Sequence, residues 1–183
     1  MKKVLFGLIL ALGLCTACGV PAQPTEEDIL AEYAKAQEAA GWFRICTAPL
    51  DYEDVTEMGG MPYHRVRDFE TYDDFTMYLG GLFGEALLDE WMDEEMPTYV
   101  NVDGKIYGLD MARGTDIGKG EESYEVIRVS GTEYILRVTV ELLDYGIPDN
   151  MDATGEVVGH ETHDFTYKYM DGDWVFTGFP EIR

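Results

Sequence analysis

The chain has 183 residues, which is enough for one domain and too few for two of ordinary size. It carries 36 acidic and 13 basic residues, a formal charge of -23. This balance argues against nucleic-acid binding, because affinity for the phosphate backbone depends on lysine and arginine. Hydrophobic residues make up 46% of the chain, so it can bury a core and does not have the composition of a disordered acidic tail.

The amino terminus has the composition of a secretory signal. Two lysines precede an apolar run at residues 4–14, which at about 1.5 Å per residue is too short to cross a hydrocarbon core of about 30 Å. Small residues then precede Cys18, as in a bacterial lipobox, where the cysteine is acylated before cleavage. The usual leucine three places earlier is Cys15 here, and ordinary secretion with cleavage near Ala22 is the alternative.

We therefore expect a lipoprotein signal peptide at residues 1–17, a lipidated cysteine and tether at 18–25, and a single domain at 26–183. Acyl chains on Cys18 would hold the protein at the extracytoplasmic face of the cell membrane, since each buried methylene contributes about 0.8 kcal/mol. Cleavage would leave 11 basic and 36 acidic residues, so lipid and not charge would anchor the protein. Cys46 would then have no disulfide partner, and we predict a small buried hydrophobe there, with a nucleophile as the alternative.

The first half of the domain has helical periodicity. Thr25, with Asp28 three residues later, resembles a capping box, and apolar residues at helical spacing predict a helix up to Gly41. The acidic stretch at residues 49–60 is predicted to be a solvated loop, and residues 63–67 alternate as a short strand does.

Two further helices are predicted before the period changes. Thr71 and Asp74 repeat the capping pattern ahead of a helix that runs into glycines 80 and 81. A third helical piece at about residues 85–92 would place its apolar side chains inward. These inward side chains are Leu87, Leu88, Trp91 and Met92.

After Pro97 the period becomes two, as in strands. Asp103-Gly104 is a two-residue hairpin signal between residues 99–102 and 105–108. Residues 125–130 and 133–142 alternate around Gly131, and a third hairpin turns at residues 171–172. Helices followed by about six antiparallel strands predict an α+β fold, with N-terminal helices packed on one antiparallel sheet.

No motif in the chain specifies a reaction. His160 and His163 are three residues apart in a strand-like stretch, whereas a zinc metalloprotease motif needs two histidines four apart on a helix. The stretch at residues 149–156 resembles a calcium loop but lacks carboxylates at positions one, three and five. We therefore expect a non-catalytic protein without metal or cofactor; an enzyme that uses His64 or His160 is an alternative class.

The connection at residues 145–156 is the candidate binding element, because long unstructured connections in small domains are commonly functional. It carries Asp149, Asp152 and Glu156, together with apolar side chains at residues 147, 148 and 151. An anionic, partly apolar projection suits a protein partner with a basic cleft. We predict these three carboxylates as partner-binding residues; a solvated loop without a partner is the alternative.

Four short motifs follow one another along the chain: Trp42-Phe43 at the end of the first helix, the segment 69–75, the hairpin at 103–107 and the segment 173–176. Their order resembles the IseA-type family of D,L-endopeptidase inhibitors, secreted or lipid-anchored proteins of Gram-positive bacteria. The resemblance implies a non-catalytic protein outside the membrane. Such a protein blocks cell-wall hydrolases of the NlpC/P60 type by seating an acidic loop against their active-site cleft. The resemblance does not say which loop does this here.

A cystatin-like or NTF2-like binding module at the cell surface is the alternative function. Its curved sheet and helices would enclose a pocket lined by Tyr99, Tyr107, Tyr134 or Trp174. A small-molecule carrier needs a cavity of about 300 Å³ or more, whereas an inhibitor should have a filled interior and an exposed acidic loop.

Overall fold

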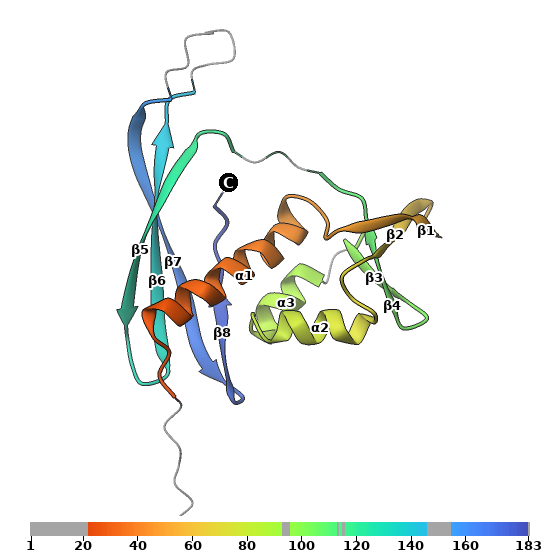
Figure 1. Ribbon diagram of the computed structural model, residues 1–183, viewed down its shortest axis with the longest axis horizontal. Helices are drawn as coiled ribbons and strands as arrows, with labels where there is room; N and C mark the ends of the chain where they lie inside the picture. Colours follow the sequence, from red (N-terminus) through yellow and green to blue (C-terminus); the bar gives the residue numbers. More distant parts are fainter. Residues whose placement is uncertain (1–21, 93–95, 113, 115, 146–154, 183) are drawn as a thin grey trace, which may run out of the picture.

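A computed structural model describes residues 22–92, 96–112, 114, 116–145 and 155–182 (Figure 1). Its elements are α1 (Glu26–Arg44), β1 (Leu50–Met58), β2 (Met61–Val66), α2 (Tyr72–Gly80), α3 (Glu85–Met92), β3 (Tyr99–Val102), β4 (Lys105–Leu109), β5 (Lys119–Arg128), β6 (Glu133–Leu143), β7 (Val157–Met170) and β8 (Asp173–Gly178). In these residues the strands form two antiparallel sheets, β1-β2-β4-β3 (sheet 1) and β5-β6-β7-β8 (sheet 2). The α+β class is confirmed. The single sheet of about six strands is wrong, because the β3–β4 hairpin pairs with β2 and not with the later hairpins.

Both predicted capping boxes are confirmed. The Thr25 hydroxyl accepts a hydrogen bond from the Asp28 amide at 3.1 Å, and the Asp28 carboxylate accepts one from the Thr25 amide at 2.9 Å. The Thr25 hydroxyl also donates to the Asp28 carboxylate at 2.7 Å, and this hydrogen bond, followed by that from the Thr25 amide, lowers the pKa of Asp28. Thr71 and Asp74 make the same reciprocal pair at the start of α2. Each box satisfies amides that have no partner inside the helix.

β1 occupies most of the stretch that was predicted to be a loop, so that prediction is wrong. The strand pairs with β2 from Leu50 opposite Val66 to Met58 opposite Met61. It is the edge strand of sheet 1, and only its first residue is buried. An edge strand that is exposed on both faces has no hydrophobic alternation, and its acidic side chains give it the composition of a loop.

The β3–β4 hairpin is confirmed and turns at Asp103 and Gly104, whose φ angles are 51° and 81°. Positive φ at both central residues is the requirement of a type I′ turn, which Asp-Gly meets at little cost. Gly108 on β4 is fixed by a close approach. A Cβ there would lie 2.7 Å from Cγ2 of Thr47, so a larger residue would push the chain after α1 away from sheet 1.

The largest hydrophobic cluster of the described residues contains side chains from both sheets and from α1 and α2. In Figure 1, α1 extends from sheet 2 towards sheet 1. The Tyr33 ring lies 4.9 Å from Phe165 of β7, and the Phe43 ring lies 5.1 Å from Tyr99 of β3. The four apolar side chains of α3 are partly buried against this cluster.

Cys46 is exposed, so the prediction of a buried hydrophobe is wrong. It lies just after α1, and its amide donates to the Gly41 carbonyl at 3.1 Å. Apolar neighbours in sequence did not reveal which side of this turn faces the core.

Sheet 2 is longer than the helical layer beside it. The upper part of β5, β6 and β7 projects past the helices in Figure 1. We call residues 116–124, 138–145 and 155–164 the arm. No helix among the described residues is both long and apolar enough to cross a membrane.

The first described residues lie against the lower end of sheet 2. The Trp174 indole donates to the Ala22 carbonyl at 3.0 Å, and the Tyr134 hydroxyl contacts the Gln23 side chain at 3.2 Å. The predicted signal peptide and Cys18 lie outside the described residues.

Candidate functional site

The inner face of β7, which faces α1, changes character at the start of the arm. Phe165 and Tyr167 are buried, whereas His163 and Glu161, on the same face two and four residues before Phe165, are half-buried. Successive inward positions therefore go from aromatic to charged along one strand. His160 is on the outer face and exposed, so the two histidines, three residues apart on a strand, lie on opposite faces of the sheet.

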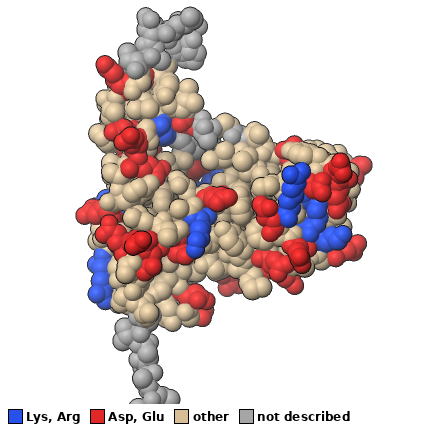
Figure 2. Space-filling model, in the orientation of Figure 1, with Lys and Arg blue, Asp and Glu red and all other residues tan. Residues whose placement is uncertain are grey.

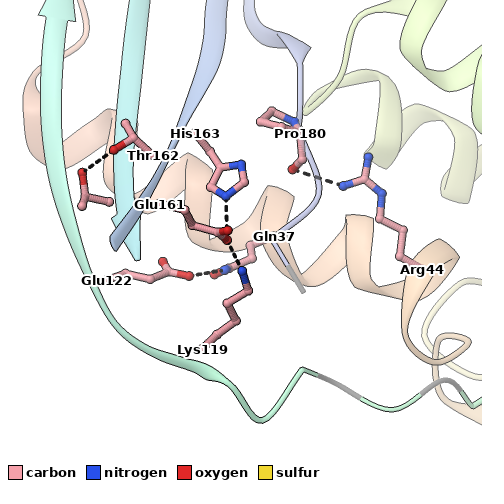
Figure 3. Close-up of polar contacts among 9 residues, drawn as sticks. Gln37, Arg44, Lys119, Glu122, Glu161, Thr162, His163 and Pro180 are labelled. Carbon is pink, nitrogen blue, oxygen red and sulfur yellow. Dashed lines mark hydrogen bonds and ion pairs between the residues drawn. The ribbon is translucent and has the colours of Figure 1, made fainter. Parts of the chain in front are cut away.

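Glu161 joins two positive or potentially positive groups on this face (Figure 3). Its Oε1 accepts a hydrogen bond from Nζ of Lys119 and lies 2.9 Å from Nε2 of His163. The hydrogen bond from Lys119, and then that from His163, lower the pKa of Glu161. Lys119 is on β5 and Glu161 on β7, so the ion pair spans β6 and links the two outer strands of the arm.

A second polar contact attaches the arm to α1. Nε2 of Gln37 donates to Oε1 of Glu122 at 3.3 Å (Figure 3). The Tyr124 hydroxyl donates to Oε2 of the same carboxylate at 2.8 Å. Nearby, Tyr33 is 3% exposed and its hydroxyl has no hydrogen-bond partner among the described residues. Burial, and then the Glu122 charge, raise the pKa of this hydroxyl. These contacts fix the position of the arm relative to the helix.

The C-terminal segment closes the lower side of this region. The Arg44 guanidinium donates to the Phe179 carbonyl at 2.8 Å and to the Pro180 carbonyl at 3.4 Å (Figure 3). A cavity of about 70 Å³ lies between α1 and this segment, with Tyr33 and Phe165 in its lining. It is too small for a substrate and has room for only a few atoms.

The far end of the arm exposes apolar side chains. We call residues 116–118, 143–145 and 155–158 the tip. Its exposed apolar residues and their exposed fractions are Ile117 (66%), Tyr145 (43%), Val157 (47%) and Val158 (66%). The exposed carboxylates at 116, 144 and 156 lie among them, and Figure 2 shows acidic side chains along the arm up to the grey loop.

Backbone hydrogen bonds hold the three segments of the tip side by side. The Leu143 amide donates to the Gly118 carbonyl and the Asp144 amide to the Glu156 carbonyl, both at 2.8 Å. The Gly155 amide donates back to the Asp144 carbonyl at 3.0 Å. The exposed apolar groups are therefore presented on paired backbone.

Of the three predicted partner-binding residues, Glu156 is exposed at the base of the loop. Asp149 and Asp152 lie outside the described residues. Sequence reasoning missed Ile117, Val157 and Val158. Two adjacent valines after an acidic residue were the available signal, but they could not be distinguished from an ordinary strand start.

The residues proposed for a small-molecule pocket do not converge. Tyr99 is in the main core, and Tyr107 is in a separate cluster on sheet 1, where its hydroxyl donates to Asp54 at 3.0 Å. Tyr134 and Trp174 contact each other in sheet 2, with ring centroids 5.4 Å apart. An open groove of about 930 Å³ lies elsewhere, between α2, α3 and the lower strands of sheet 2.

The remaining candidates for catalysis or metal binding are histidine and carboxylate side chains. His64 packs against Tyr52 with ring centroids 4.9 Å apart and ring planes inclined by 56°, and its Nδ1 is buried without a partner among the described residues. Among all the residues that the structure describes, no group of three or more His, Cys, Asp or Glu side chains is arranged to hold a metal ion.

No family model matches the chain, and no significantly similar curated protein is found.

Proposed function

We propose that this protein is a non-catalytic, lipid-anchored inhibitor of a peptidoglycan hydrolase, a D,L-endopeptidase of the NlpC/P60 type. The tip of the arm, with the acidic loop beyond it, is the proposed contact surface. The observation that supports this most is the group of exposed apolar side chains surrounded by carboxylates at the end of a projecting three-stranded arm.

An apolar centre with a polar rim is the usual composition of a protein interface. Burial of Ile117, Val157 and Val158 would contribute roughly 25 cal/mol per Å² of apolar surface removed from water. The carboxylates around them would steer the arm towards a basic cleft and fix its orientation there. To enter a cleft, the apolar and acidic side chains must lie on a surface that protrudes from the body of the protein, and the arm does so.

The polar contacts of the arm reduce the entropic cost of binding. The Lys119–Glu161 pair links β5 to β7, and the Gln37–Glu122 hydrogen bond links the arm to α1. A preorganised element loses less conformational freedom on association than a flexible loop does. Inhibition would follow from occlusion: carboxylates oppose basic residues around the catalytic cysteine of the hydrolase, and the arm fills the space that the substrate needs.

The test measures inhibition of purified NlpC/P60-type hydrolases by a muropeptide digestion assay. The double variant V157S/V158S should raise the inhibition constant at least tenfold, because it replaces apolar side chains at the centre of the tip with hydroxyls. V129S is the matched control, since Val129 is 52% exposed at the other end of β5. Replacement of Asp149, Asp152 and Glu156 by their amides should weaken inhibition further and flatten its salt dependence.

Equal inhibition by the tip variant and the wild-type chain would exclude the tip as the contact. Retained inhibition with unchanged salt dependence in the amide variant would exclude the acidic loop.

The open groove favours a second candidate, a small-molecule binding module, because its volume of about 930 Å³ exceeds the few hundred Å³ that such a ligand requires. The same assay separates the two functions. If the protein is a small-molecule carrier that uses the groove, neither the wild-type chain nor the tip variants should inhibit any of the hydrolases.

A further inference from the structure

The upper half of β7 has a strand on one side only. β6 pairs with β7 from Val157 to Lys168, whereas the pairing with β8 begins at Thr166. Along residues 160–164, the other edge of β7 faces no strand of the described chain. In Figure 1 this edge of the arm lies on the side away from the helices.

The backbone groups on this free edge can be identified from the register. The Tyr169 amide donates to the Thr132 carbonyl next to β6, so the odd-numbered residues of β7 direct their N–H and C=O groups towards β6. Because successive residues of a strand alternate in direction, His160, Thr162 and Asp164 direct theirs to the free edge. The structure gives these groups no backbone hydrogen bond to any described residue on that side.

The sequence of this edge is complementary to itself. Residues 160–164 read His-Glu-Thr-His-Asp. In an antiparallel pair centred on Thr162, Thr162 faces its own copy, His160 faces Asp164, and Glu161 faces His163. Every carboxylate then faces an imidazole. A shift by two residues instead places Glu161 opposite Glu161 or His163 opposite His163, so one register is preferred.

We propose that two copies of this protein associate through the free edge of β7, antiparallel about Thr162, and join their two copies of sheet 2 into one continuous sheet. Open strand edges are usually protected from such pairing by charge. Here each carboxylate on the edge would instead face an imidazole, which can donate a hydrogen bond to it.

The existing contacts of the edge are compatible with this pairing. Glu161 accepts from Lys119 and His163, and Asp164 accepts from Arg137 through both oxygens, at 2.8 and 2.9 Å. A carboxylate has about four acceptor positions, so each of these groups can take one more donor. The net charge of -23 opposes association at long range. We therefore expect pairing near 0.15 M salt, where the screening length is about 8 Å.

Disulfide trapping tests the register directly. The full-length chain, with its three cysteines replaced by serine, receives T162C and is oxidised in mild detergent at 0.15 M salt. Facing residues of a hydrogen-bonded antiparallel pair have Cα atoms about 5.5 Å apart, within the range that a disulfide accepts. H160C is the matched control, because its two copies would be offset by four residues, about 13 Å along the strand.

We expect at least five times more covalent dimer with T162C than with H160C. Adding H160E to T162C should reduce the dimer at least fivefold, since two carboxylates then face each other on both sides of the axis. Equal trapping at both positions, or no trapping at Thr162, would overturn the proposal. A dimer that is insensitive to H160E would overturn the charge-specified register. The hydrolase assay is independent of these outcomes.

Discussion

The lower and upper halves of β6 and β7 follow the same strand alternation but are filled differently. In the lower half, Leu136 and Phe165 are fully buried, and Phe165 packs on Tyr33 of α1. In the upper half, the inward positions of β7 hold Glu161 and His163, which keep partial access to solvent. Val140 and Val138, which face them on β6, stay buried in the core. The change from core to ionisable side chains is therefore confined to β7.

The largest expected difference between the two halves is in the free energy of unfolding, and a cavity made below the arm should reveal it. F165A should lower the free energy of unfolding by about 3–5 kcal/mol, since a buried aromatic ring with several ring contacts is lost. H163A, two residues earlier on the same face, should cost less than about 1 kcal/mol. Urea unfolding of both variants measures the difference, and similar losses would contradict the division into two halves.

The helix that covers the lower half provides an intermediate effect. T25A removes the reciprocal cap of α1 and should cost about 1 kcal/mol, because amides at the helix start lose their acceptor. T25S keeps a hydroxyl in the same place and should be close to the wild type. Thermal unfolding compares the two variants. A loss in T25S as large as in T25A would mean that the methyl group and not the cap stabilises the helix.

The smallest effect concerns the arm itself and depends on pH. The pKa of Glu161 is lowered in the folded protein, so its ion pair stabilises the fold above the ordinary pKa of a glutamic acid, about 4.3. This stabilisation is lost as the pH falls through the lowered value. E161Q should cost less than about 1 kcal/mol at pH 7, because the pair is partly exposed, and less at pH 3 than at pH 7.

Melting temperatures at the two pH values measure this difference. E53Q, on the exposed edge strand of sheet 1, controls for the loss of one negative charge. The interpretation fails if E161Q lowers the melting temperature equally at both pH values.

Sequence reasoning succeeded where the signal is local. The caps at Thr25 and Thr71 and the turn at Asp103 depend on side chains within four residues of each other, and all three are confirmed. The division into two sheets depends on which hairpins pair across long separations, and no local pattern encodes this. β1 was missed because an edge strand with two exposed faces has no alternation.

The candidate site divides in the same way. An acidic connection after β6 could be found from composition and length, and Glu156 is exposed as expected. The apolar part of the tip could not be found, because Ile117 and Val157 come from separate segments that only the sheet brings together. The exposure of Cys46 likewise depends on how the chain leaves α1, which its neighbours do not specify.

The hydrogen bond from Trp174 to Ala22 determines where the chain leaves the body: at the bottom of sheet 2 in Figure 1, with the arm at the top. Cys18 is four residues earlier, a reach of at most about 14 Å. If Cys18 carries the proposed lipid, the body would rest close to the bilayer and the arm would point away from it. An enzyme cutting peptidoglycan above the membrane would then reach the arm first.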